Sequence, residues 1–435
     1  MKARAQMLRA LLVAAAVLVG GYVQAQYAPM QYFRYNDKRG LNVYETSKTD
    51  TVVFDGIKVR VGGDFAIQFQ ALSQSSGLPT VSGIDTLQRL ANNFNLPAAN
   101  LNLDVQLADG IRLHMRTYLS SRHHNEGWVK GGYLQFDNLD FIKEGFLSGL
   151  MDVATIRFGY NDINYGDMHF RRSDNATVIY NPFVGNYIMD SFTTEPFGEI
   201  TIQKNGILGV VGITNGRLNQ ATADPTAGPA SAPIDGDNGA SIYLKAGYDK
   251  QINDDLRFRL TGSYYASSDK STREYLYNSD RAGARYYEVL NRRGENNDFQ
   301  PRLNPGWAYL NAIMVNPFVK YQGLEFFGVY EIANNGNSGE GGQYTNSAGE
   351  LLYRFGGNDQ LYVGARYNGV SGKVNDTAGD RKINRQNYAF GWFITDNILA
   401  KFEYVTETRE GAGWQGSVFQ DAKWDGFVIE AAISF

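Results

Sequence analysis

The sequence predicts an all-β protein, a transmembrane antiparallel β-barrel of about 16 strands, and three observations support this prediction. Short segments along nearly the whole chain alternate apolar and polar residues, as strands do when one face meets lipid and the other meets water. Long polar loops and short turns alternate between these segments, which is typical of outer-membrane barrels. After the first 25 residues no run is long and apolar enough for a spanning helix, and an exported chain without such helices crosses a membrane only as a closed barrel.

Residues 1–25 have the features of a secretory signal peptide. Basic residues at the start precede an apolar run over 10–21, and the small residues Val23 and Ala25 place the cleavage site before Gln26. The alternative interpretation is a membrane anchor, for which the apolar run is too short. No cysteine follows the cleavage site, so a lipoprotein is excluded. We therefore expect export by a cleaved signal peptide to the cell outer membrane of a Gram-negative bacterium.

Residues 26–55 are polar and form an N-terminal extension ahead of the barrel, which we assign to 56–435. Asn36–Gly40 has the composition of a turn. Two interpretations of the extension stay open. It is either a periplasmic tail, or a segment folded into the lumen as a plug or a subunit contact.

The first three strands show the alternating pattern in full. In the first strand, apolar residues such as Phe65 and Ile67 alternate with charged and amide residues. Asp109-Gly110 is a tight hairpin turn between the second strand and the third. The expected strands are 56–71, 98–108, 111–121, 127–137, 153–161, 197–204, 207–214, 240–249, 256–267, 306–319, 323–333, 348–356, 360–370, 385–395, 397–407 and 424–435. The even number places both chain ends in the periplasm, and 138–151 is expected to be a small helix or a wide turn.

The last strand ends on an aromatic residue. Phe427 and Ile429 fall on one face, and Glu430 falls on the other, because side chains alternate across a strand. The closing Phe435 resembles the terminal signal that outer-membrane barrels present to their assembly machinery. We therefore expect the barrel-assembly machinery to be a partner of this strand, and outer-membrane lipid to be a partner of the apolar face.

Residues 162–195 interrupt the alternation. The segment follows the fifth strand, is too irregular to be a strand itself, and is rich in Asp, Tyr and Asn. In large barrels with a water-filled lumen, the third external loop folds inward and sets the narrowest point. We expect a constriction loop here, with an extracellular cap as the alternative. Its charged residues are Asp162, Asp167, Arg171, Arg172, Asp174, Asp190 and Glu195.

Sixteen strands leave a water-filled lumen unless a segment folds in, and charges on the polar strand faces are expected to line it. Charges of one sign bias which ions enter a narrow pore. We expect the basic residues to form a path for anions or polar solutes, with ordinary solvation of the lumen wall as the alternative. The expected pore-lining residues are the basic Lys58, Arg60, Arg112, Arg116, Arg157, Arg257 and Arg259 and the acidic Glu325, Glu331, Glu403 and Glu430.

Composition argues against several other classes of protein. The formal net charge is −4, whereas nucleic-acid binding favours a basic balance, so no nucleic-acid partner is expected. The 48 Gly, 28 Tyr and 25 Phe suit an all-β chain. The absence of Cys excludes disulfides and thiolate metal sites. No phosphate-cradling loop or His-Glu-x-x-His motif occurs, and we expect no cofactor and no metal.

Three features together carry a family resemblance: the signal peptide, the strand Ala154–Tyr160 leading into Asn181-Pro182-Phe183, and the final Phe435. In these the chain resembles the porin-like outer-membrane proteins of Bacteroidota, which are related to the phosphate-selective porin O and P family. The resemblance implies a sixteen-stranded trimeric porin whose arginines and lysines conduct phosphate. The chain departs from that pattern, because it is acidic overall and has no dense lysine cluster. Phosphate selectivity therefore does not transfer.

We expect a channel through which small polar solutes or ions, including anions, diffuse passively, and not an enzyme. The first alternative is a barrel enzyme such as a phospholipase, which needs a Ser/His or Asp/His arrangement. His123-His124 with Glu126 is the candidate cluster, with a polar rim as the simpler explanation, and the other histidines are His114 and His169. The second alternative is a hydrophobic-solute transporter, for which 26–55 is too polar to form the plug.

Overall fold

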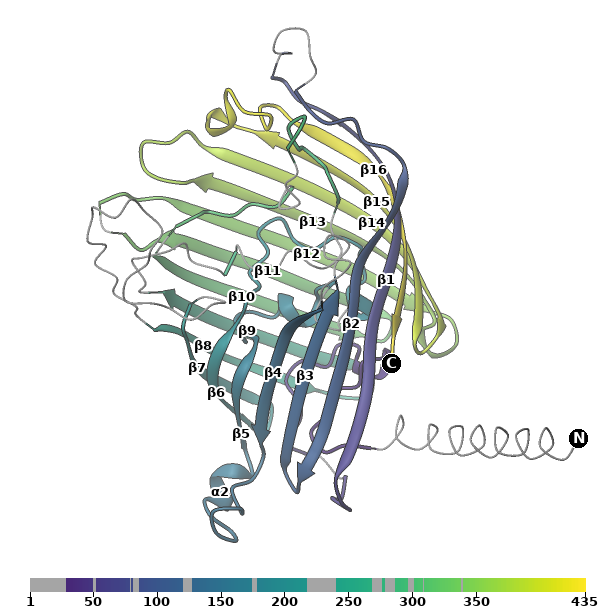
Figure 1. Ribbon diagram of the computed structural model, residues 1–435, viewed down its shortest axis with the longest axis vertical. Helices are drawn as coiled ribbons and strands as arrows, with labels where there is room; N and C mark the ends of the chain where they lie inside the picture. Colours follow the sequence, from purple (N-terminus) through teal and green to yellow (C-terminus); the bar gives the residue numbers. More distant parts are fainter. Residues whose placement is uncertain are drawn as a thin grey trace, which may run out of the picture.

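The computed structural model describes residues 29–49, 52–78, 80, 86–119, 127–173, 178–216, 240–267, 276–277, 286–295, 301–307, 309–337 and 339–435. Within these ranges, sixteen strands follow one another around a closed barrel, and each pairs antiparallel with its neighbours (Figure 1). The predicted all-β antiparallel barrel is confirmed. The strands are β1 (Lys58–Ser75), β2 (Asn93–Ala108), β3 (Ile111–Leu119), β4 (Trp128–Phe136), β5 (Ala154–Asp162), β6 (Thr194–Lys204), β7 (Ile207–Thr214), β8 (Ser241–Gln251), β9 (Leu256–Ser267), β10 (Leu310–Tyr321), β11 (Leu324–Asn335), β12 (Gln343–Phe355), β13 (Leu361–Lys373), β14 (Arg381–Thr395), β15 (Ile398–Glu410) and β16 (Lys423–Ser434).

The barrel closes where the first strand meets the last. β1 pairs with β16 from Asp64 opposite Ser434 to Ser75 opposite Lys423. Beyond that register, Gly63 and Phe435 exchange two backbone hydrogen bonds, each with an N···O distance of 3.1 Å. The sheet therefore has no unpaired edge, which is the condition for a β-structure to sit in lipid.

Several strands are longer than the alternation predicts. β2 begins at Asn93, β12 at Gln343 and β14 at Arg381, each four or five residues before the predicted start. The added residues are mostly polar, but their backbones continue the ladder. Apolar alternation marks only the part of a strand that faces lipid, whereas hydrogen bonding between strands needs no apolar side chain.

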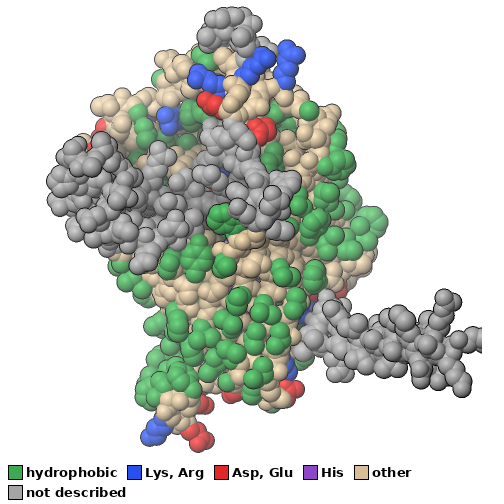
Figure 2. Space-filling view, in the orientation of Figure 1, with side chains coloured by type: hydrophobic (Ala, Val, Ile, Leu, Met, Phe, Trp, Pro, Cys, Tyr) green, Lys and Arg blue, Asp and Glu red, His purple; other side chains and the backbone are tan. Residues whose placement is uncertain are grey.

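The outer face of the barrel is apolar. Phe427 and Ile429 on β16 are exposed, whereas the intervening Val428 and Glu430 are buried, as the alternation predicts. Figure 2 shows hydrophobic side chains spread over the barrel wall in this orientation. A soluble protein rarely exposes so many large apolar side chains, and lipid is the solvent that suits them.

Residues 138–151 form the predicted wide turn with a small helix, α2 (Ser148–Met151), which projects from one end of the barrel (Figure 1). Phe141, Ile142 and Leu147 on this turn are all at least half exposed. No helix in the described part of the chain has the length and apolarity needed to cross a membrane.

The interior of the barrel is occupied, and the loop between β5 and β6 folds inward as predicted. Two other regions also contact inward-facing wall residues: the N-terminal segment 29–49, and the described residues of the β9–β10 connection. Together they build an apolar cluster inside the barrel that includes Tyr187 from the loop and Met314 and Phe318 from β10. This packing fills much of the space that sixteen strands would otherwise leave to water.

Candidate channel lumen

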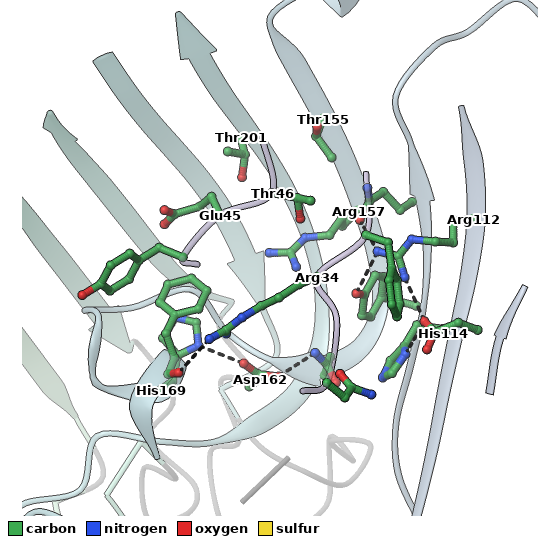
Figure 3. Close-up of a pocket in the computed structure, with 18 of the residues that line it drawn as sticks. Arg34, Glu45, Thr46, Arg112, His114, Thr155, Arg157, Asp162, His169 and Thr201 are labelled. Carbon is green, nitrogen blue, oxygen red and sulfur yellow. Dashed lines mark hydrogen bonds and ion pairs between the residues drawn. The ribbon is translucent and has the colours of Figure 1, made fainter. Parts of the chain in front are cut away.

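A cavity of about 130 Å³ lies in the barrel interior, between β2–β6, the N-terminal segment and the inward loop (Figure 3). Three of the predicted basic residues line it: Arg112, Arg116 and Arg157. The other lining residues are Phe33, Arg34, Asn36, Tyr44, Glu45, Thr46, Asp104, His114, Tyr133, Gln135, Thr155, Asn161, Asp162, His169, Phe170, Tyr180 and Thr201.

Arg112 and Arg157 are fixed by neighbouring strands. Arg112 donates from Nη1 to Asp104 Oδ1 at 2.9 Å and from Nη2 to Gln135 Oε1 at 3.0 Å. Arg157 donates from Nε to Glu199 Oε1 at 3.1 Å, and the two residues lie directly opposite in the β5–β6 pairing. The guanidinium planes are thus held in one orientation without closing the cavity.

The cavity wall carries polar atoms that lack a hydrogen-bond partner in the described part of the chain. They include Arg112 Nε, Arg116 Nη1, His114 Nε2 and Asn161 Oδ1. All four residues are more than 90% buried. A buried polar group without a partner is costly, so this wall keeps hydrogen-bonding capacity that the described part of the protein does not itself use.

Two histidines flank the cavity, and a carboxylate orients each of them (Figure 3). His114 Nδ1 lies 2.8 Å from Asp104 Oδ1, and His169 Nδ1 lies 2.9 Å from Asp162 Oδ2. An Asp–His pair is also the basic half of a hydrolase site, but the described residues around the cavity include no serine to act as nucleophile.

The other predicted basic residues hold internal segments in place and lie outside the cavity lining. Arg259 donates to Asp167 at 2.8 Å, and Arg257 donates to the Asn42 carbonyl at 2.8 Å. Lys58 pairs with Asp55, and the Arg60 guanidinium lies 5.4 Å from the rings of Phe33 and Tyr35. Position on an alternating strand alone does not separate these residues from Arg112, Arg116 and Arg157.

Arg171 connects the inward loop to the acidic side of the barrel. Its Nη1 donates to Glu325 Oε1 at 2.8 Å and to Asn42 Oδ1 at 2.6 Å, and its Nη2 donates to Glu350 Oε2 at 3.0 Å. All of these side chains are buried. The loop is therefore fastened to β11 and β12, opposite the cavity.

Asp167 fastens the loop to the strands on its other side. It accepts from Lys245 Nζ at 2.9 Å, from Arg259 and from Thr261 Oγ1 at 2.7 Å. Burial by itself would raise the pKa of this carboxyl, but Arg259 and Lys245 outweigh it and hold the pKa well below its usual range. Asp167 is therefore a permanent anion inside the barrel.

The remaining loop charges also have partners. Arg172 and Arg302 both donate to Asp190, and Glu195 accepts from Thr193. Asp162 is described above with His169. Asp174, His123, His124 and Glu126 lie outside the described residues.

The four predicted acidic residues are buried in partnered positions. Glu325 binds Arg171 and Arg354, and Glu331 accepts from Tyr165, Tyr277 and Asn346. Glu403 accepts from the Val184 backbone and from Tyr286, and Glu430 pairs with Lys401. These carboxylates bind inner loops and wall cations, and none lines the cavity in the described part of the chain.

Two charged residues of the site come from the N-terminal segment, and the alternating strand pattern does not identify them. Arg34 lies with its guanidinium 4.1 Å from the ring centroid of Tyr180 and donates to the Phe170 carbonyl. Glu45 pairs with Arg259. The segment has no alternation, so the sequence offered only its high content of polar and aromatic residues as a signal.

No protein-family model matches the sequence, and no curated protein sequence matches it. The structure is similar to the outer membrane channel DcaP of Acinetobacter baumannii, with 12% identity over 88% of this chain and 99% of that chain and a TM-score of 0.54. It is similar to an anion-selective porin from Comamonas acidovorans, with 10% identity over 87% and 100% and a TM-score of 0.51. OmpF of Salmonella typhi, solved with daunomycin, has 12% identity over 88% and 99% and a TM-score of 0.51. The chain thus has the fold of bacterial outer-membrane porins.

Proposed function

We propose that this protein is a passive outer-membrane channel for small polar solutes, with a preference for anions, and that it has no catalytic activity. The observation that supports the proposal is the cavity beside β2–β6. It is lined by four arginines, Arg34, Arg112, Arg116 and Arg157, and by three carboxylates. Loop 162–195 forms one side of it and is the constriction in this proposal.

The positive and negative side chains that line the cavity are not simply paired with one another. Glu45 is drawn toward Arg259 and Lys245, which lie outside the lining, and Asp104 is shared between Arg112 and His114. Arg116 has Asn102 as its hydrogen-bond acceptor, and its Nη1 is buried without a hydrogen-bond partner in the described part of the chain. With four arginines and three carboxylates, the lining has a formal excess of one positive charge, which favours anions.

Planar-bilayer recordings in a salt gradient test the proposal. We expect a water-filled conductance whose reversal potential reports anion preference. Arg116→Gln should reduce that preference. The matched control is Lys382→Gln, because Lys382 also carries one positive charge but is exposed at the end of β14, paired with Glu410. A cation-preferring channel, or equal effects of both variants, would remove the anion path.

A catalytic function is tested separately. Detergent-solubilised protein is incubated with an ester substrate, and His114→Ala is compared with the unmodified chain. We expect no hydrolysis by either. Hydrolysis that disappears in His114→Ala would replace the channel proposal with an enzymatic one.

A further inference from the structure

We infer that the N-terminal segment, residues 29–49, is a fixed inner wall of the permeation path and that it determines the width and charge preference of the channel. The inference rests on the proposed channel function. If the protein were not a channel, the same residues would be only a buried tail, with no effect on solutes.

The segment is bound to the barrel at both of its ends. Gln31 donates to Asp109 Oδ1 at 2.9 Å, and its Oε1 accepts from the Gly110 backbone at 2.9 Å, at the β2–β3 turn. Near the other end, Lys48 Nζ lies 3.1 Å from Asp137 Oδ1, directly after β4. Both attachments are therefore on the wall that borders the cavity.

Between these ends the segment crosses to the opposite wall. Asn42 donates to Glu325 Oε2 at 2.8 Å on β11, and its carbonyl accepts from Arg257 on β9. Its side-chain oxygen accepts from Arg171 of the inward loop. Asn42 has a φ of 56°, a left-handed conformation that asparagine adopts more readily than most residues. One residue thus connects the segment, the inward loop and two strands.

Glu45 adds a buried ion-pair network. Its Oε2 lies 2.9 Å from Arg259 Nη1, and its Oε1 lies 3.3 Å from Lys245 Nζ. Both cations also bind Asp167 of the inward loop. Removing one member of such a network leaves a buried charge uncompensated, so the segment and the loop hold each other in position.

The path of the segment divides the barrel interior into two parts. On one side lie the acidic residues of β11 and β12, joined to Asn42 and Arg171. On the other side lies the arginine-lined cavity, into which the segment contributes Arg34 and Thr46 (Figure 3). The inward loop also lies between the two parts, because Phe170 lines the cavity and the adjacent Arg171 binds Glu325. We expect removal of the segment to take away one of these two dividers, and so to widen the channel and to weaken anion preference.

Cysteine labelling tests this arrangement, since the chain contains no cysteine of its own. Thr46 lines the cavity, whereas the adjacent Ser47 is exposed and is not part of the lining. We expect a charged methanethiosulfonate reagent to lower the single-channel conductance of Thr46→Cys at least several-fold more than that of Ser47→Cys. A cationic reagent should increase anion preference in Thr46→Cys, and an anionic reagent should decrease it. Equal or absent effects at the two positions would overturn the inference.

Deletion of 29–49 and the single change Glu45→Gln provide the second test. We expect the deletion to raise the conductance and lower the anion-to-cation permeability ratio. We expect Glu45→Gln to add conductance steps between the level of the unmodified protein and the level of the deletion. If the unmodified protein conducts but neither change alters conductance or selectivity, the inference fails and the channel function stands. If the unmodified protein does not conduct, the proposed function itself fails. If the deletion does not assemble, the cysteine comparison decides alone.

Discussion

Replacing Arg171 with methionine should loosen the inward loop while leaving the barrel closed. The guanidinium makes three buried hydrogen bonds, to Glu325, Glu350 and Asn42, with donor–acceptor distances of 2.6 to 3.0 Å. Methionine keeps most of the side-chain volume but removes the charge. The strand ladder is untouched, because Arg171 lies outside every strand.

The expected cost follows from what the change leaves behind. Removing one partner of a buried ion pair costs roughly 3–5 kcal/mol, because the other charge stays buried alone. Glu325 and Glu350 keep Arg354 and Arg366 as partners, with N···O distances of 3.0 and 2.7 Å. The cost should therefore lie near the lower value, about 3 kcal/mol. Since about 1.4 kcal/mol changes an equilibrium constant tenfold, the ratio of docked to undocked loop should fall on the order of 100-fold.

Single-channel recording measures this change as open-channel noise and additional conductance levels, and gel mobility of unheated samples checks that the barrel is intact. The matched control is Lys320→Met. Lys320 pairs with Asp359 at 3.2 Å, and both side chains are about one-third exposed, so the pair contributes at most about 1 kcal/mol. Arg171→Lys should give an intermediate effect. A quiet trace of unmodified amplitude from Arg171→Met would refute the role of this residue in holding the loop.

Three further predictions concern the lipid face, the interior and pH. Val211→Arg should cost about 2–4 kcal/mol in urea unfolding from lipid vesicles, because Val211 is exposed near the middle of β7, whereas Val211→Leu should be neutral. Asp167→Asn should lower the thermal stability of the folded barrel by about 3 kcal/mol, since Lys245 and Arg259 lose their shared anion, and an unchanged melting temperature would contradict this. The pKa values of Glu45 and Asp167 are held below their ordinary values of 4.5 and 3.8, so their ion pairs contribute fully above those values and lose their contribution as pH falls through the folded-state values. The difference in open-channel noise between the unmodified chain and Asp167→Asn should therefore stay constant from about pH 8 to about pH 5 and shrink only on stronger acidification, and a change of this difference near neutral pH would contradict the assignment.

The strand architecture could be predicted from the sequence because its cause is local. Side chains alternate across a strand, so lipid on one side and polar groups on the other leave a period of two in the sequence itself. Phe427, Ile429 and Glu430 show this at the last strand, and the structure places them as the pattern requires. Sixteen repetitions of the same local rule then determine a closed barrel.

The contents of the barrel could not be predicted in the same way, because they depend on contacts between distant residues. Arg157 and Arg259 look alike in the sequence, each an arginine on the polar face of a strand. Arg157 lines the cavity, whereas Arg259 binds Glu45 and Asp167, which lie far away in the sequence. Whether such an arginine lines the cavity or binds an internal segment therefore depends on which segments pack beside it.

The residue pattern of β10 does indicate that the inner face of this strand is covered. On β10, Ala312, Met314 and Phe318 point inward and are fully buried, while Ile313 on the other face is exposed. A strand that is apolar on both faces cannot border water on either side. In a barrel, such a strand indicates that a segment packs against it from within. Here Tyr44 of the N-terminal segment packs on Phe318 with ring centroids 5.6 Å apart, and Gly166 of the inward loop lies against Met314.

We expect the selectivity of this lumen to depend on which inward charges already have partners. The four predicted acidic residues of β11, β15 and β16 are each bound to a cation or to hydrogen-bond donors inside the barrel. These carboxyl groups therefore hold loops and wall cations in place before any solute arrives. The donors without a partner in the described part of the chain, Arg112 Nε and Arg116 Nη1, both belong to residues that line one cavity.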